Sequence, residues 1–81
     1  MSSSEFDVSA NGEWILFANT LAVPVTEITL IQVIEGEKGQ CYLEFHLIHS
    51  NRKVAVFASK EVALLTLQRI TTKFPIKYSE I

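Results

Sequence analysis

The sequence predicts an α+β domain in which an antiparallel meander of four to five strands is followed by one C-terminal helix packed on one sheet face. Cys41 to His49 alternates apolar and polar side chains, the pattern of a strand with one core face and one wetter face. Val25 to Glu35 is rich in β-branched residues, which favour strands. Residues 60–73 are strong helix formers with apolar residues at helical spacing. Strands followed by a single helix predict two packed layers.

The chain is long enough for one domain and no more, with 81 residues. Its composition is 48% hydrophobic, which is high for so thin a core, so surplus apolar side chains are expected on the surface. Residues 1–12 are Ser-rich and predict a flexible leader, in which Phe6 to Val8 could pair as a short edge strand through a turn at Asn11-Gly12. A single α+β domain is expected over residues 13–81.

Three segments before residue 50 are expected to form strands. The first, Trp14 to Phe17, is aromatic and β-branched, and Pro24 separates it from the second, Val25 to Glu35. Residues 36–39 form a turn in which two glycines can absorb positive φ angles. The third strand, Cys41 to His49, has the clearest alternation.

A tight turn at Ser50 to Lys53 leads to the fourth strand. With Asn51 and Arg52 as the central residues of the turn, Leu47 lies opposite Val56, and His49 lies opposite Val54. This register brings the apolar faces of the two strands together. The sheet face expected under the helix therefore carries Leu43, Phe45, Leu47, Val54 and Val56.

The helix has clear start and stop signals. Ser59 is a good N-cap residue, and Pro75 ends the helix. One apolar stripe faces the sheet, formed by Ala63, Leu67, Ile70 and Phe74. Leu65 points roughly 200° away from Ala63, and thus away from the stripe. A short last strand could follow at Ile76 to Tyr78.

The sheet face opposite the helix is predicted to be more apolar than a solvent-facing surface should be. It is expected to carry Ile31, Val33, Tyr42, Ile48, Ala55 and Phe57. Three covers remain open: the strand around Trp14 could curl over the face and close a small barrel, a second copy could stack on it, or a different partner could bind it. With His46 and the outward-pointing Leu65 added, the candidate interaction face is Ile31, Val33, Tyr42, His46, Ile48, Phe57 and Leu65.

Charge and composition exclude several classes of partner. The net charge is -2 and there is no basic block, so no nucleic acid is expected. The longest apolar-rich stretch, Leu21 to Ile34, is interrupted by polar residues and cannot span a bilayer, so no membrane association is expected. A lone cysteine, Cys41, excludes an internal disulfide and fits a reducing compartment. Because the start of the sequence also lacks the pattern of a secretory signal, the expected location is the cytoplasm.

No catalytic site, metal site or cofactor is predicted. Glu44 and His46 share one face of their strand while His49 points to the other, so the three side chains do not converge on one ion. Cys41 faces the predicted core and is interpreted as a small buried hydrophobe rather than a nucleophile. Residues 36–39 lack the spacing of a phosphate-binding loop and join a strand to a strand.

The order of four strands and a capped helix over residues 14–74 resembles the small bacterial relatives of the pleckstrin-homology superfold. The segment Leu21 to Ile28, which leads into a long strand, adds to this resemblance. The resemblance is architectural and rests on no diagnostic motif. It implies a sheet with a C-terminal helix, in a chain expected to be too short for the seven strands usual in that superfold.

The leading hypothesis for function is a non-enzymatic interaction or assembly module, expected to form a homodimer or to bind another protein through its apolar outer sheet face. The alternative hypothesis is a small-molecule or lipid-binding domain with a pocket between the sheet and the Trp14 segment. An enzyme is the third hypothesis. It would require Glu44 and His46 to meet a residue of another copy across a dimer interface.

Overall fold

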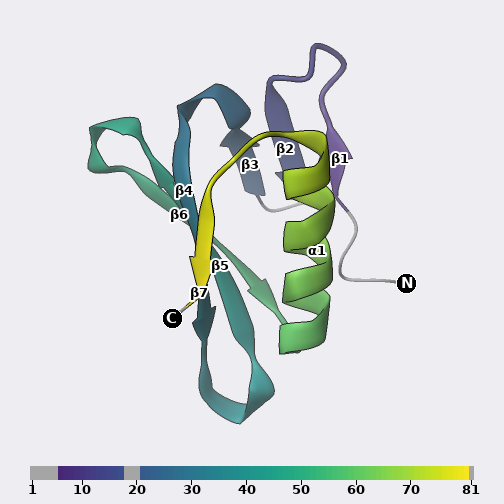
Figure 1. Ribbon diagram of the computed structural model, residues 1–81, viewed down its shortest axis with the longest axis vertical. Coiled ribbons are helices and arrows are strands. Elements are labelled where there is room, and N and C mark those ends of the chain that lie inside the picture. Colours follow the sequence, from purple (N-terminus) through teal and green to yellow (C-terminus); the bar gives the residue numbers. More distant parts are fainter. Residues whose placement is uncertain (1–5, 18–20, 81) are drawn as a thin grey trace.

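The computed structural model describes residues 6–17 and 21–80, which form seven strands in two sheets and one α-helix (Figure 1). The small sheet has the strand order β1 (Asp7–Val8), β2 (Trp14–Phe17), β3 (Leu21–Pro24). The large sheet has the order β6 (Arg52–Phe57), β5 (Cys41–Leu47), β4 (Ile28–Glu35), β7 (Tyr78–Glu80). Neighbouring strands are antiparallel except β4 and β7, which are parallel.

The structure confirms the α+β class and the C-terminal helix on one sheet face, but the strands are divided differently. The described residues form seven strands in two sheets instead of four to five in one meander, and these sheets do not close into a barrel. The expectation that the chain is too short for seven strands was therefore wrong. Strands of two to four residues, such as β1 and β3, are too short to show a periodic pattern in the sequence.

The N-terminal hairpin forms where the edge strand was predicted. β1 pairs with β2, and Gly12 adopts the positive φ angle (73°) that the turn requires. The hydroxyl of Ser9 accepts a hydrogen bond from the Trp14 N–H at 3.1 Å, which fixes the loop against β2. Residues 1–5 of the predicted leader lie outside the described residues.

Helix α1 (Lys60–Lys73) begins and ends where the sequence predicts. The Ser59 hydroxyl accepts a hydrogen bond from the Val62 N–H at 3.2 Å, as expected for an N-cap. The side of α1 that faces the large sheet buries Ala63, Thr66, Leu67 and Ile70. Within the described residues, no helix has the length and apolar character required to cross a membrane.

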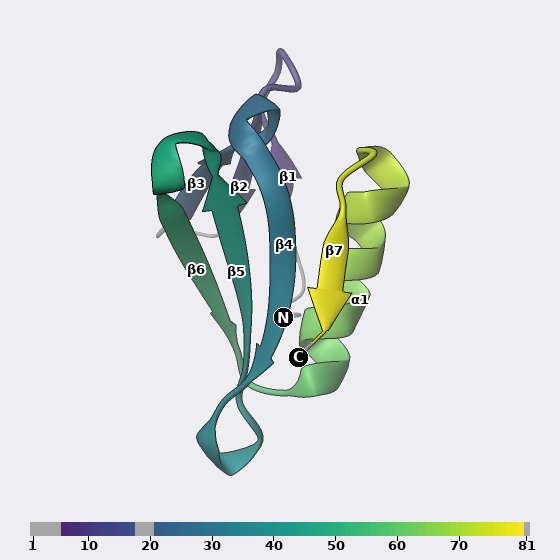
Figure 2. The ribbon, with the colours of Figure 1, turned by 60° about the vertical axis from the view of Figure 1, so that its left-hand side comes forward.

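The small sheet packs on the same face of the large sheet as α1, so that together they cover that face (Figure 2). Ile15 is fully buried, and the Phe17 ring lies 5.7 Å from Phe45 and 6.3 Å from Phe57. The Lys53 ammonium donates a hydrogen bond to the Ala22 carbonyl at 2.8 Å, which ties β6 to β3. These contacts join β2 and β3 to the large sheet. The pocket of the alternative hypothesis stays a prediction.

The predicted register between β5 and β6 was wrong by five residues. Val56 lies opposite Tyr42, not Leu47, because residues Ile48–Ser50 form a longer turn in which His49 and Ser50 have positive φ angles (63° each). An odd shift moves every side chain of a strand to the other face. Val54 and Val56 therefore lie outside, on the face away from the helix, while Ala55 and Phe57 lie inside.

The same kind of correction applies to β4. Ile31 pairs with Phe45 and Val33 pairs with Leu43, so both residues lie on the face under α1 and the small sheet. Ile31, Val33 and Phe57 are at most 3% exposed. Their predicted place on an uncovered face was wrong, and they belong to the core of the single chain.

Candidate interaction surface

The face of the large sheet that points away from α1 carries no described helix or strand (Figures 1 and 2). The register arranges its side chains in three rows across β4, β5 and β6. We call this surface the outer face; its rows are Leu30–His46–Arg52, Gln32–Glu44–Val54 and Ile34–Tyr42–Val56. One end of the outer face is polar, and the other end is apolar.

The polar end is a closed network of hydrogen bonds and ion pairs. His46 Nε2 lies 2.9 Å from Glu44 Oε1 and 2.9 Å from Gln32 Oε1. The second carboxylate oxygen of Glu44 lies 3.8 Å from the Arg52 guanidinium. The Glu44 side chain is only 17% exposed, so its charge is held largely by these neighbours. A partner could cover this end without leaving the carboxylate unpaired.

The apolar end is built from Ile34, Tyr42, Val54 and Val56. Val56 is 60% exposed and Val54 is 45% exposed, although each lies beside a half-buried neighbour in its row. The Tyr42 ring lies against the backbone of Gly36, where an added Cβ would meet ring atoms at 2.7 to 2.8 Å. The missing side chain of Gly36 therefore leaves room for the Tyr42 ring.

Strand β6 forms an open edge beside this apolar end. The Leu47 N–H donates to the Asn51 carbonyl at 2.7 Å, which makes this a hydrogen-bonded pair. By the alternation of an antiparallel ladder, the backbone N–H and C=O groups of Val54 and Val56 then point away from β5. No described strand pairs with this edge. One border of the outer face therefore carries both the backbone groups of Val54 and Val56 that point away from β5 and the exposed side chains of these two residues.

Three of the seven predicted interaction residues, Ile31, Val33 and Phe57, lie in the core, and the other four are divided among three places. Tyr42 and His46 lie on the outer face, half-buried, and Ile48 is exposed in the turn that follows β5. Leu65 is 49% exposed on α1, on the opposite side of the molecule. A single flat partner on the outer face cannot also contact Leu65. The interaction role of these four residues stays a prediction.

Sequence reasoning missed the apolar residues of the outer face other than Tyr42, namely Leu30, Ile34, Val54 and Val56. The apolar residues of β4 occupy both of its faces, so hydrophobicity alone does not orient this strand. A signal was present in the polar residues: placing Gln32 opposite Glu44 gathers the polar side chains on one face, as the structure does.

In the described part of the chain, no group of three His, Cys, Asp or Glu residues is placed to hold a metal ion. Cys41 is buried, and burial, followed by the nearby Glu35 carboxylate, raises the pKa of its thiol. His49 lies in the turn after β5, where it lines a polar groove of about 550 Å³ with His46 and Arg52.

Comparisons of the chain with protein-family models, with curated proteins and with solved structures find no match. A shared fold would not by itself define an activity, because one fold supports many functions. The chemistry of the outer face is therefore the basis for a functional conclusion.

Proposed function

We propose that this protein is a non-enzymatic assembly module that forms a homodimer through the outer face of its large sheet. The observation that carries the proposal is a difference between the two faces of the large sheet. α1 and the small sheet bury the inner face, which is the face opposite the outer face, while Val54 and Val56 remain exposed on the outer face. Apolar side chains grouped on an uncovered sheet face are typical of an interaction site.

A second copy suits this surface for two reasons. In a twofold-symmetric contact the same patch of each copy meets its counterpart. The row Ile34–Tyr42–Val56, called the apolar row, can therefore lie on the apolar row of the other chain. The polar end also suits such a contact, because the Glu44 carboxylate already lies 3.8 Å from the Arg52 guanidinium and 2.9 Å from His46 Nε2 within its own chain. Like charges of the two copies would then face each other with little unpaired charge.

A dimer interface of standard size would occupy a modest part of the surface of this chain. A standard interface buries about 800 Å² on each partner, which is about 15% of the 5321 Å² accessible surface of this chain. One broad face of a small domain supplies an area of that order. The open β6 edge adds main-chain hydrogen-bonding groups next to the same face.

The test is the molar mass in solution, measured by gel filtration with light scattering between about 5 µM and 1 mM, because self-association depends on concentration. We expect a mass twice that of the 81-residue chain at the higher concentrations. Val56→Asp places a charge in the apolar row and should return the chain to a monomer over the whole range.

Leu65→Asp is the matched control. Leu65 is also an exposed apolar residue, at 49% against 60% for Val56, but it lies on α1. The control should remain dimeric, and the circular dichroism spectra of both variants should match that of the parent. A parent chain that stays monomeric at every concentration, or a Val56→Asp chain that stays dimeric, contradicts the proposal.

A further inference from the structure

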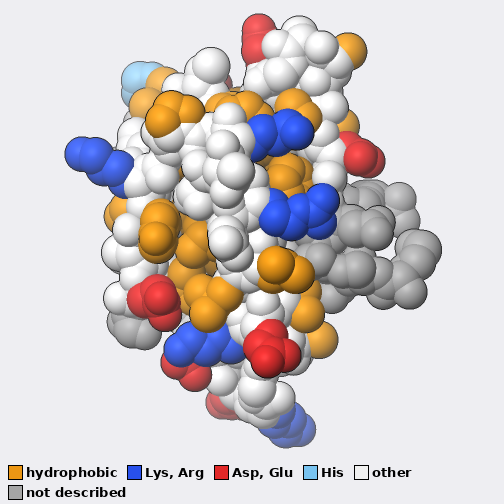
Figure 3. Space-filling model, turned by 45° about the vertical axis from the view of Figure 1, so that its right-hand side comes forward, with side chains coloured by type: hydrophobic (Ala, Val, Ile, Leu, Met, Phe, Trp, Pro, Cys, Tyr) orange, Lys and Arg blue, Asp and Glu red, His pale blue; other side chains and the backbone are white. Residues whose placement is uncertain are grey.

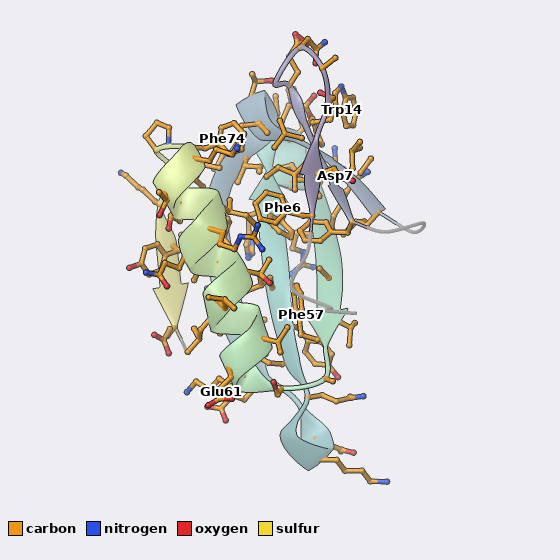
Figure 4. The ribbon with its side chains drawn as sticks, turned by 90° about the vertical axis from the view of Figure 1, so that its right-hand side faces the viewer. Phe6, Asp7, Trp14, Phe57, Glu61 and Phe74 are labelled. Carbon is orange, nitrogen blue, oxygen red and sulfur yellow. The ribbon has the colours of Figure 1, made fainter. Side chains whose placement is uncertain are left out.

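A second surface lies between the N-terminal strand and the helix, remote from the outer face. An open groove of about 680 Å³ runs there, with Phe6, Asp7 and Val8 on one wall and Gln68, Arg69, Thr72 and Lys73 on the other. Figure 4 shows Phe6 projecting from the start of β1 toward α1. Figure 3 shows the surface on this side, where Lys and Arg side chains lie beside exposed hydrophobic ones.

The strand wall of the groove is an open sheet edge. β1 is an edge strand of the small sheet: β2 pairs with one side of it, and no described strand pairs with the other side. The Ser9 N–H donates to the Trp14 carbonyl at 3.0 Å, so Ser9 belongs to a hydrogen-bonded pair. Val8, the next position along the ladder, then points its N–H and C=O away from β2 and toward the groove. An extended chain could pair with these groups.

The helix wall supplies two cations. The Arg69 guanidinium carbon lies 5.6 Å from the centre of the Phe6 ring, which holds the side chain at the groove. Among the described residues, neither Arg69 nor Lys73 forms an ion pair with a carboxylate. Among the described residues that line the groove, Asp7 is the single acidic one, so these residues together carry one more positive charge than negative.

The spacing of the cations matches that of a strand. Arg69 and Lys73 are four residues apart on α1, so their Cβ atoms lie about 6 Å apart on one side of the helix. Alternate residues of an extended chain lie about 6.6 Å apart and point to the same side. Two acidic side chains separated by one residue could therefore reach Arg69 and Lys73 together.

We propose that the groove between β1 and α1 binds an extended peptide segment of a partner protein, one with acidic side chains at alternate positions. The segment adds a strand to the small sheet through the backbone of Val8, and its carboxylates pair with Arg69 and Lys73. This site does not depend on the dimer of the outer face, because the two surfaces share no residue.

The probe for the test is a fluorescein-labelled hexapeptide that alternates glutamate and valine, with binding followed by fluorescence polarisation. The monomeric Val56→Asp chain is used beside the parent, so that a failure of the dimer and a failure of the groove are distinguished. We expect both chains to bind with the same Kd, of the order of 10 to 100 µM for so short a contact.

Three changes separate the two parts of the recognition. The double variant Arg69→Gln and Lys73→Gln should weaken binding at least about tenfold, since it removes both charge-assisted contacts. The matched double variant Lys38→Gln and Lys77→Gln removes two exposed cations outside the groove and should leave the Kd unchanged. A peptide N-methylated at alternate amides keeps its charges but loses its strand hydrogen bonds, so it should bind at least about tenfold more weakly.

Several outcomes would overturn the proposal. A lysine and valine peptide that binds as well as the acidic one would show that the cations do not select the ligand. Unchanged binding by the Arg69 and Lys73 double variant, or by the N-methylated peptide, would place the contact elsewhere. Binding to phosphatidylserine vesicles without binding to the peptide would identify the groove as a site for an anionic membrane surface.

Discussion

The two faces of the large sheet are made by the same strands and differ in what covers them. On the inner face, Leu43 and Phe45 are fully buried under α1 and the small sheet. On the outer face, Val54 and Val56 are exposed, and Glu44 and His46 form a polar network of their own. Within residues 6–17 and 21–80, one helix and three short strands pack against the four-stranded sheet, and they cover one of its two faces.

Hydrophobicity alone does not decide which face is covered. In β6 the two valines lie outside, whereas Lys53 and Ala55 lie inside. Two contacts favour this arrangement: Phe57 joins Phe17 in the aromatic cluster, and the Lys53 ammonium reaches the Ala22 carbonyl. The free energy gained by burying the Phe57 ring exceeds the free energy lost by leaving Val54 and Val56 exposed. The Lys53 ammonium keeps a hydrogen bond at the margin of the core.

The largest effect should come from a deletion in the inner face. Phe45→Ala removes a ring that is 0% exposed, and we expect a loss of about 3 to 5 kcal/mol in the free energy of unfolding. That is at least about a quarter of the roughly 4 to 12 kcal/mol available to a chain of this length. Urea denaturation at a low concentration, where the chain is monomeric, measures it.

The matched deletion in the outer face is Val56→Ala. This side chain is 60% exposed, so its truncation should change the unfolding free energy by no more than about 0.5 kcal/mol in the monomer. Equal losses in Phe45→Ala and Val56→Ala would mean that the two faces are equally covered, and the contrast between them would fail.

Thiol labelling compares the solvent accessibility of the two faces. Cys41 is buried, and burial together with the Glu35 carboxylate raises the pKa of its thiol. We expect it to react with iodoacetamide at least about 100-fold more slowly than the exposed thiol of Val56→Cys in a Cys41→Ala chain. Similar rates at low protein concentration would show that Cys41 is accessible in the folded chain.

The pH dependence of the same thiol has a definite sign. Because its pKa is raised in the folded chain, the unfolded chain loses this proton first as the pH rises. The neutral thiol thus contributes stability below its ordinary pKa of 9.0, and this contribution is lost as the pH rises toward the folded value. Cys41→Ala should remove that part of the alkaline loss of stability.

Local signals in the sequence predicted the elements well and their pairing poorly. The helix, its Ser59 cap and its buried stripe are confirmed because each depends on neighbouring residues. The register of β6 depends on the Ile48–Ser50 turn, where His49 and Ser50 adopt positive φ angles. Such angles are uncommon for residues other than glycine, so the sequence does not predict them here. An error in that turn exchanged the two faces, so the candidate surface included the buried Phe57 and omitted the exposed Val56.

A moderate effect is expected where the helix that covers the inner face begins. Ser59→Ala removes the acceptor of the Val62 N–H and should lower the unfolding free energy by about 1 kcal/mol. Ser59→Asp keeps a capping oxygen and places a negative charge at the helix N-terminus, so it should restore the parental value. Both are measured by urea denaturation, and an equal loss in the aspartate variant would argue that the hydroxyl acts in some way other than capping.

The smallest effect on folding, and the sharpest test of the outer face, should come from Gly36→Ala. The φ angle of Gly36 is -101°, which any residue can adopt, so the methyl group meets no backbone strain. It meets the Tyr42 ring instead, at 2.7 to 2.8 Å, and the ring must move out of the apolar row. Gly to Ala replacement stabilises by about 0.4 to 1 kcal/mol through the unfolded chain, so the net change in unfolding free energy should be near zero.

Self-association should respond where folding does not. A displaced Tyr42 ring reduces the shape complementarity between the apolar rows of the two copies. We therefore expect the dimer Kd of Gly36→Ala, measured by light scattering, to be several-fold higher than that of the parent. Tyr42→Ala removes the ring, so adding Gly36→Ala to it should cause no further change in the Kd. If Gly36→Ala weakens the dimer equally with and without the ring, the Tyr42 contact is not what the substitution disturbs, and the apolar row is not the surface that the two copies share.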